Sequence, residues 1–134
     1  MEALQPSHHI LLDTHAAIWF FTDVTKLSKP AAKAIYNLNN MIYVSIASVW
    51  ELAIKLGTGK LTLAGGIDSF IEAIHINDFK LLEVSLEHIK IVKGLPLIHR
   101  DPFDRMLVAQ AMTECMGIMT IDENILKYDV SVIW

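Results

Sequence analysis

Four acidic residues are spaced along the chain so that they could act together on one ligand. Asp13 directly follows a short apolar run (HILL), and Asp122 follows a second one (IMTI). Glu51 lies one turn into the helix predicted after a third run (IYV), and Asp104 lies one turn into the helix predicted after Asp101. If the runs are parallel strands, strand ends and helix starts share one edge of the sheet, and the four carboxylates converge there.

Carboxylates brought together in this way favour a bound cation. Two unit charges about 4 Å apart repel by about 4 kcal/mol at an effective dielectric constant of about 20, so such a cluster either protonates or binds a cation. Oxygen ligands without cysteine select a hard ion, and we expect Mg²⁺, with Mn²⁺ as the alternative. This arrangement suits metal-assisted hydrolysis of a phosphodiester, in which a carboxylate orients or deprotonates the attacking water.

Each acidic residue also has a local structural explanation. Asp13 and Asp122 could be helix N-caps, because their carboxylates can accept hydrogen bonds from the free amides at a helix start. Glu51 completes a capping-box pattern that begins at Ser48 (SVWE), and Asp104 would favour the dipole of its helix. Taken singly, each residue is better explained as a cap. The functional interpretation therefore depends on all four residues sharing one edge of the sheet.

Alternating strands and helices must position these residues. Strands are predicted at residues 9–12, 42–44, 81–84, 118–121 and 130–133. Helices are predicted at residues 14–21, about 30–39, 45 or 48 to 56, 68–76, 86–93, 102–116 and 122–127. Continuous apolar strands separated by helices predict an α/β fold with a mainly parallel sheet covered on both faces.

The composition indicates one globular domain over residues 1–134. Hydrophobic residues make up 53% and charged residues 19%, which excludes a disordered chain and leaves enough apolar surface to favour self-association or a protein partner. The net charge of −4 is unlike that of a basic nucleic-acid-binding domain, so a polyanionic substrate would need a bound cation. With one cysteine, no leader and no apolar run of about 20 residues, we expect a cytoplasmic protein that does not enter a membrane.

The segments around the four acids resemble those of the PIN-domain family, and within it the VapC-type toxins of toxin–antitoxin modules. The matching segments are LLDTH at 11–15, VSIASVWE at 44–51, LPL at 95–97, HRDPFDR at 99–105, MTID at 119–122 and VIW at 132–134. The resemblance spans nearly the whole chain. It implies a three-layer α/β/α PIN fold and Mg²⁺-dependent endoribonuclease activity on RNA. It also implies a cognate antitoxin that wraps the toxin and blocks its site, and a toxin homodimer.

The resemblance implies a role for each acidic residue. Asp13 and Asp104 match the family's direct metal ligands, while Glu51 and Asp122 would hold metal-bound water or a second ion. Asp101 competes with Asp104 for the third acidic position. The segment that begins at Asp104 (DRMLVAQA) matches the family helix better, which leaves Asp101 as the N-cap.

Other polar residues near the acids could assist them or contact the substrate. The hydroxyl residues that could hydrogen-bond the acids are Thr120 and either Thr14 or Ser45. His15 or His99 could touch RNA, and no pair of histidines has the spacing of metal ligands on one helix face. Arg100 and Arg105 could bind phosphates or form internal ion pairs with Asp101 or Asp104.

Two apolar features are expected to lie in the core. Cys115 continues the apolar pattern of the predicted helix 102–116, so we expect it to be a small buried residue. The cluster Trp19-Phe20-Phe21 is expected to pack in the core, with a partner surface as the alternative, because three adjacent large side chains cannot all face one core.

The residues also leave other functions open. A PIN nuclease that processes RNA outside toxin–antitoxin modules would carry the same acids. If the acids are only caps, the chain is a non-catalytic binding domain. Phosphoryl transfer through an aspartyl-phosphate at Asp13 is disfavoured, because the dehalogenase-type pattern has a second aspartate two residues later, where this chain has His15.

Overall fold

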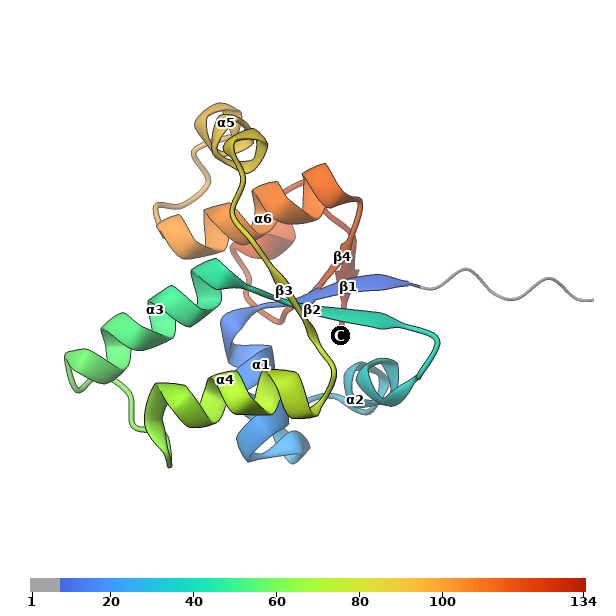
Figure 1. Cartoon of the computed structure of the whole chain (residues 1–134). Coiled ribbons are helices and arrows are strands. Elements are labelled where there is room, and N and C mark those ends of the chain that lie inside the picture. The colour runs from blue at the N-terminus through green and yellow to red at the C-terminus, as the bar shows by residue number, and fades with distance from the viewer. Residues whose placement is uncertain (1–7) are drawn as a thin grey trace, which may run out of the picture.

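A parallel sheet of five strands runs through the centre of the protein. The computed structural model describes residues 8–134 (Figure 1). The strands are β1 (His9–Leu12), β2 (Met41–Ser45), β3 (Lys80–Leu82), β4 (Gly117–Met119) and β5 (Val132–Ile133). They are ordered β3-β2-β1-β4-β5, and every neighbouring pair is parallel. The predicted α/β fold with a parallel sheet is confirmed.

Helices connect the strands, and most begin at a capping side chain. The helices are α1 (Thr14–Thr22), α2 (Lys29–Tyr36), α3 (Ile46–Gly57), α4 (Gly66–Ile76), α5 (Leu86–Gly94) and α6 (Pro102–Glu114), with short 3₁₀ helices η1 (Val24–Lys26) and η2 (Ile125–Lys127). The N-cap side chains that accept a backbone amide hydrogen bond include Asp13, Ser28, Ser45, Ser85 and Asp101. These short polar residues satisfy amides that the first helical turn leaves free.

The core has two halves, one on each face of the sheet. Alternate residues of β1 point to opposite faces, so Ile10 and Leu12 join one cluster while Leu11 joins the other. The first cluster includes Phe70 of α4, and the second includes Leu107 of α6. Helices α1, α2 and α4 lie on one side of the sheet and α5 and α6 on the other (Figure 1), which confirms the three-layer α/β/α arrangement.

The direction of the chain brings several segments to the carboxyl edge of the sheet. Strand β1 leads directly into α1, and β2 leads directly into α3. Helix α6 leads into β4 and so runs against the strands, which places its first turn at the same edge. The sheet order puts β1 between β2 and β4, so the chain changes sides at β1. Ligands of open α/β sheets bind beside such a switch point.

Two local predictions around the acids are wrong. Strand β4 ends at Met119 rather than at Ile121, because its neighbours β1 and β5 offer partners only up to Met119. Asp122 therefore lies in a loop beyond the strand. The capping box over Ser48 and Glu51 is also wrong, since Ser45 caps α3 by accepting the Ala47 amide and Glu51 lies inside the helix.

Cys115 does not lie in the core, contrary to the sequence prediction. Helix α6 ends at Glu114, and Cys115 follows it as an exposed C-cap in the left-handed region (φ 55°). Helices often stop with one residue in this conformation, which turns the chain away from the helix axis. By contrast, the cluster Trp19-Phe20-Phe21 is half-buried and packs against the first half of the core, as predicted.

The predictions about targeting and membranes rest on different parts of the chain. The expected lack of a leader concerns residues 1–7, which lie outside the described part. Among the helices within residues 8–134, none has both the length and the apolar character needed to cross a bilayer.

Candidate active site

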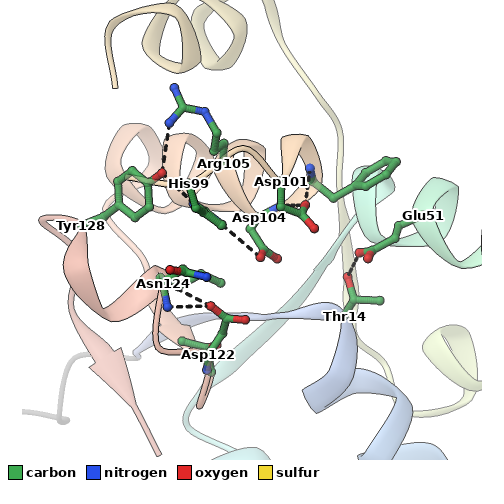
Figure 2. Close-up of polar contacts among 12 residues, drawn as sticks. Thr14, Glu51, His99, Asp101, Asp104, Arg105, Asp122, Asn124 and Tyr128 are labelled. Atoms are coloured by element: carbon green, nitrogen blue, oxygen red, sulfur yellow. Dashed lines mark hydrogen bonds and ion pairs between the residues drawn. The ribbon is translucent and has the colours of Figure 1, made fainter. Parts of the chain in front are cut away.

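The four predicted acids lie close enough at the carboxyl edge for their charges to interact. The charge of Asp122 acts on both Asp13 and Asp104, and the charge of Glu51 acts on Asp104. Figure 2 shows the Asp104 carboxylate, from the first turn of α6, pointing toward the loop that carries Asp122. Three crossover connections and the start of α6 thus contribute carboxylates to one region.

Asp13 ends β1 and is nearly enclosed by protein. Its side chain is the N-cap of α1, with Oδ1 accepting a 2.7 Å hydrogen bond from the Ala16 amide. Burial raises the pKa of Asp13, and the charge of Asp122 adds to the rise. Hydrogen bonds from Thr120 and Ala16 and the nearby His15 act in the opposite direction. The cap prediction and a functional role are therefore compatible for this residue.

The buried hydroxyl of Thr120 links Asp13 to Asp122. Its Oγ1 accepts a 2.9 Å hydrogen bond from the Asp122 amide, and the side chain also hydrogen-bonds Asp13. Because the Thr120 oxygen accepts the hydrogen bond from the Asp122 amide with a lone pair, its hydroxyl proton can be donated to the Asp13 carboxylate. The prediction that Thr120 supports the acids is confirmed.

Glu51 is buried and satisfied by partners from two helices. Thr14 of α1 donates a 2.7 Å hydrogen bond to Oε1, and the hydroxyls of Thr14 and Ser48 are hydrogen-bonded at 2.9 Å. Lys55, one turn further along α3, donates to Oε2 at 2.7 Å. The bond to Glu51 raises the pKa of Lys55, which favours its charged form. Ser45, the other predicted partner of the acids, serves only as the cap of α3.

Asp104 occupies the first turn of α6 and faces the other acids. Asp101 caps this helix with hydrogen bonds to the amides of Phe103 and Asp104, as predicted. Burial, together with the charges of Asp101, Asp122 and Glu51, raises the pKa of Asp104 to about 6. A 3.2 Å hydrogen bond with His99 opposes this rise. The ionised form of this carboxylate thus lacks an adequate positive partner.

Asp122 is held by the backbone that follows it. Its Oδ1 accepts hydrogen bonds from the amides of Asn124 at 2.8 Å and Ile125 at 3.2 Å (Figure 2). The side chain thereby closes the turn before η2, in the manner of a capping aspartate. One carboxylate oxygen fixes the loop, and the group as a whole is half-exposed beside Asp104.

The donor set fits a hard divalent cation. Within residues 8–134, no three His, Cys, Asp or Glu side chains already converge as a closed set of metal ligands. Mg²⁺ does not need such a set, because it takes one or two carboxylates and keeps several waters. Asp13 and Asp104 both have a pKa raised by burial and by neighbouring negative charge, which is the electrostatic condition that a cation relieves.

The two arginines of the HRDPFDR segment differ in burial. Arg105 is buried and donates to the carbonyls of Val92, Leu95 and Pro96 and to the Tyr128 hydroxyl, so its guanidinium is turned into the protein and forms no ion pair with Asp101 or Asp104. Arg100 is exposed.

The two histidines predicted to face the substrate also differ. His99 bridges Tyr128 and Asp104 rather than facing outward (Figure 2). His15 is exposed at the start of α1 and lies against Trp19, with ring centroids 5.8 Å apart. Its place beside Asp13 is compatible with a substrate contact.

Sequence reasoning missed two residues of this region. Lys55 could have been found from the sequence, because a spacing of four from Glu51 on one helix is the usual signal for an ion pair. No sequence pattern marks Tyr128, because only the tertiary fold brings it to His99 and Arg105.

An apolar groove adjoins the acids between α3 and α6. It has a volume of about 460 Å³ and is lined almost entirely by apolar groups: Ile46, Ala47, Trp50, Val84, Ile89, Val92, Pro102, Phe103 and Met106. Trp50 is 63% exposed and meets Phe103 edge-on, with centroids 5.2 Å apart. Each of these aromatic residues directly precedes one of the acids in the sequence, so the groove is lined by the same turns of α3 and α6 that carry Glu51 and Asp104.

Comparison with known proteins supplies the family. The sequence profile described as the PIN domain matches residues 10–131. No curated protein sequence matches the chain. A chain of the DNA-bound VapBC2 complex of Rickettsia felis has a similar fold, with a TM-score of 0.71 and 14% identity over 92% of this chain and 96% of that one.

Two further solved structures are similar. A chain of the DNA-bound VapBC complex of Salmonella typhimurium has a TM-score of 0.65 and 14% identity over 93% of this chain and 96% of that one. The PIN domain endonuclease Utp24 has a TM-score of 0.50 and 18% identity over 92% of this chain and 78% of that one. At these identities the structures establish the fold, and the profile match over most of the chain shows that this protein belongs to the PIN domain family.

Proposed function

We propose that this protein is a Mg²⁺-dependent endoribonuclease that hydrolyses phosphodiester bonds of RNA. The observation that carries the proposal is that the Asp122 side chain lies close enough at the carboxyl edge of the sheet for its charge to act on both Asp13 and Asp104. Bringing these carboxylates together from separate elements costs electrostatic repulsion, which a bound cation would remove. Membership of the PIN family and the printed description of Utp24 as an endonuclease support the same activity.

In this proposal Asp13 and Asp104 hold the ion, which is Mg²⁺ or Mn²⁺. A bound ion would neutralise these carboxylates, attract the polyanionic substrate to an acidic protein and polarise a phosphoryl oxygen. Thr120 keeps the Asp13 carboxylate in place through a hydrogen bond. His99 does the same for Asp104.

Glu51 and Asp122 complete the arrangement by handling water. Asp122 is anchored through Oδ1, so its other oxygen can accept a hydrogen bond from the attacking water. Glu51 is held by hydrogen bonds from Thr14 and Lys55, and in this position it can orient water or a second ion. Both groups are fixed before substrate arrives, which is the condition for effective positioning.

The decisive experiment is cleavage of RNA by the purified protein with Mg²⁺, Mn²⁺ or EDTA. Wild-type protein should cleave RNA with either ion and lose the activity in EDTA, while Asp13→Asn and Asp104→Asn should abolish it. A single-stranded DNA of matching sequence tests whether RNA is the substrate. Equal cleavage by all three proteins would contradict the proposal, and the absence of cleavage and of ion binding would favour the non-catalytic binding domain.

We further propose that the protein is the toxin of a toxin–antitoxin pair, acting in the cytoplasm and bound by a cognate antitoxin. Two of the similar folds come from VapBC complexes, and the apolar groove with its exposed Trp50 gives a protein partner a surface beside the acids. Expression should arrest bacterial growth, and coexpression of a small protein from a neighbouring gene should restore it. Growth without arrest would favour the PIN nuclease of RNA processing.

The apolar surface also supports a homodimer. Exposed large apolar residues include Leu86, Ile89 and Leu97 in addition to Trp50. Light scattering after size-exclusion chromatography should give about twice the monomer mass of 15.1 kDa. A single species at the monomer mass would contradict this part of the proposal.

A further inference from the structure

A chain of hydrogen bonds runs from the protein interior to the Asp104 carboxylate. The Nη1 atom of Arg105 donates to the Tyr128 hydroxyl at 3.0 Å, and this hydroxyl lies 2.9 Å from Nδ1 of His99. The Nε2 atom of His99 lies 3.2 Å from Oδ2 of Asp104. Figure 2 shows the chain passing from α6 through Tyr128 and His99 and back to α6. The nuclease activity proposed above does not itself require this chain.

The residues at the two ends of this hydrogen-bond chain determine which atoms donate and which accept. Arginine can only donate hydrogen bonds, and an ionised carboxylate can only accept them. The Tyr128 oxygen accepts from Arg105 and can therefore donate its own proton to Nδ1 of His99. His99 then carries its proton on Nε2 and donates it to Asp104, so each of the three hydrogen bonds pairs one donor with one acceptor. The tautomer of the imidazole is thus selected by the partner behind it.

The interior end of the chain is fixed, and the outer end is accessible. Arg105 and Tyr128 are buried, and three further guanidinium N–H groups donate to the carbonyls of Val92, Leu95 and Pro96. The side chains of His99 and Asp104 are 12% and 20% exposed. The bond from His99 uses Oδ2 of Asp104, so the lone pairs of Oδ1 remain for a ligand on the accessible side.

We infer that His99 is a positioning residue that orients Asp104 for a divalent cation, and that Tyr128 and Arg105 hold the His99 ring in the orientation this requires. The inference rests on the proposed function, because it needs a cation at Asp104. Side chains that hydrogen-bond a metal ligand from behind commonly contribute a factor of about 10 to 100 in metal affinity or activity. The alternatives are that His99 only stabilises the loop before α6 or that it touches RNA directly.

Binding of Mn²⁺ to the full chain, followed by the electron paramagnetic resonance of free Mn²⁺, separates these alternatives. His99→Ala should weaken Mn²⁺ binding by about 10- to 100-fold. His99→Gln keeps a donor toward Asp104 and should recover most of the affinity. Tyr128→Phe removes only the support behind the ring and should weaken binding less than His99→Ala does. Cleavage at saturating Mn²⁺ should be restored in His99→Gln.

A second histidine–tyrosine pair in the same chain supplies the matched control. His9 and Tyr43 are hydrogen-bonded at 3.0 Å on β1 and β2, and their pair is exposed. Tyr43→Phe removes the same hydroxyl as Tyr128→Phe but should leave Mn²⁺ affinity unchanged. If Tyr43→Phe and Tyr128→Phe lower the affinity equally, the effect is not specific and the inference is overturned.

Asp104→Asn distinguishes failure of this inference from failure of the proposed function. If Asp104→Asn leaves Mn²⁺ binding unchanged, the proposed cation site is wrong and the inference fails with it. If Asp104→Asn removes binding while His99→Ala leaves it unchanged, only the inference is overturned. Reduced RNA cleavage by that His99 variant would then indicate direct substrate contact. If His99→Ala does not fold, His99→Gln and Tyr128→Phe still carry the test.

Discussion

Thr14 and Glu51 are 37 positions apart in the sequence, yet the Thr14 hydroxyl donates a 2.7 Å hydrogen bond to the Glu51 carboxylate. The bond joins the first turn of α1 to the interior of α3, and therefore the crossover after β1 to the crossover after β2. A buried carboxylate needs such a donor, because burying an ionised group without hydrogen bonds is costly. The pair shows that the edge carrying the acids is tied together by side chains.

Removing this hydroxyl should lower stability. Thr14→Val keeps the shape of the side chain but leaves buried acceptor atoms without a donor, so we expect the free energy of unfolding in urea to fall by about 1–3 kcal/mol. Thr14→Ser, which keeps the hydroxyl, should lose about 1 kcal/mol or less from the deleted methyl group. Thr113→Val on the exposed face of α6 should change stability by less than about 0.5 kcal/mol. Equal effects of the valine and serine variants at position 14 would contradict the role of the hydrogen bond.

The raised pKa of Asp104 predicts a pH dependence of the metal-free protein. The folded value of about 6 exceeds the ordinary value of 3.8, so the folded state binds the proton more tightly than the unfolded state does. The free energy of unfolding should therefore fall as the pH rises from about 4 to about 6 and change little above that. We expect this residue to contribute about 1–2 kcal/mol to the decrease, since partial exposure screens the effect.

Asp104→Asn should flatten that pH dependence. In EDTA at pH 7.5 the variant should be as stable as the wild type or up to about 2 kcal/mol more stable, because the carboxylate that loses stability on ionising is gone. Some slope should remain, since burial also raises the pKa of Asp13. Urea denaturation at several pH values measures both effects. A loss above about 2 kcal/mol would instead indicate that Asp104 serves mainly as a structural residue of α6.

Divalent cations should stabilise the wild-type protein and not the site variants. If the dissociation constant is about 1 mM, 10 mM Mg²⁺ adds about 1.4 kcal/mol and raises the melting temperature by about 3–6 °C. Asp13→Asn and Asp104→Asn should lose most of this shift. Asp68→Asn, on the exposed first turn of α4, should retain it. A shift of the same size in all four proteins would point to binding elsewhere.

Arg105 should act on folding, whereas Arg100 should not. Lysine cannot reproduce the hydrogen bonds that the Arg105 guanidinium makes to carbonyls in the last turn of α5 and in the loop that follows it, so Arg105→Lys should destabilise the protein by about 2–3 kcal/mol. Arg100→Lys exchanges one exposed cation for another and should be neutral within about 0.5 kcal/mol. Thermal or urea unfolding of the two variants gives the comparison. Equal stability of both would show that the buried contacts contribute little.

The sequence predicted all five strands, and it came close to the bounds of β1 and β2 because both are apolar runs. It placed the end of β3 two residues too late and the start of β5 two residues too early. It located the end of β1 directly before Asp13 and the cap of α6 at Asp101, since both features are encoded by adjacent residues. It misplaced the end of β4, because a strand stops where its neighbours stop offering partners, and that depends on β1 and β5. The order of the strands in the sheet could not be predicted either, because it does not depend on neighbouring residues in the sequence.

In the candidate site too, local features could be predicted and tertiary contacts could not. Thr120 could be expected beside the acids because it lies two residues before Asp122. The fates of His99 and Arg105 could not, because their partners include Tyr128, which is more than 20 positions away and carries no motif. The same segment thus contains an arginine turned into the protein and one turned to solvent, a difference that only tertiary packing decides.

The left-handed turn that ends α6 leaves Cys115 exposed at the opposite end of that helix from Asp104, and this is the only thiol in the 134 residues. Eleven residues of helix correspond to about 16 Å, so a fluorophore attached to the sulfur would not touch the acids. A labelled molecule could report nucleotide or antitoxin docking by energy transfer, without any engineered cysteine. The same exposure means that preparations stored in air would cross-link in pairs through this sulfur, and a reducing agent must be present whenever association is measured.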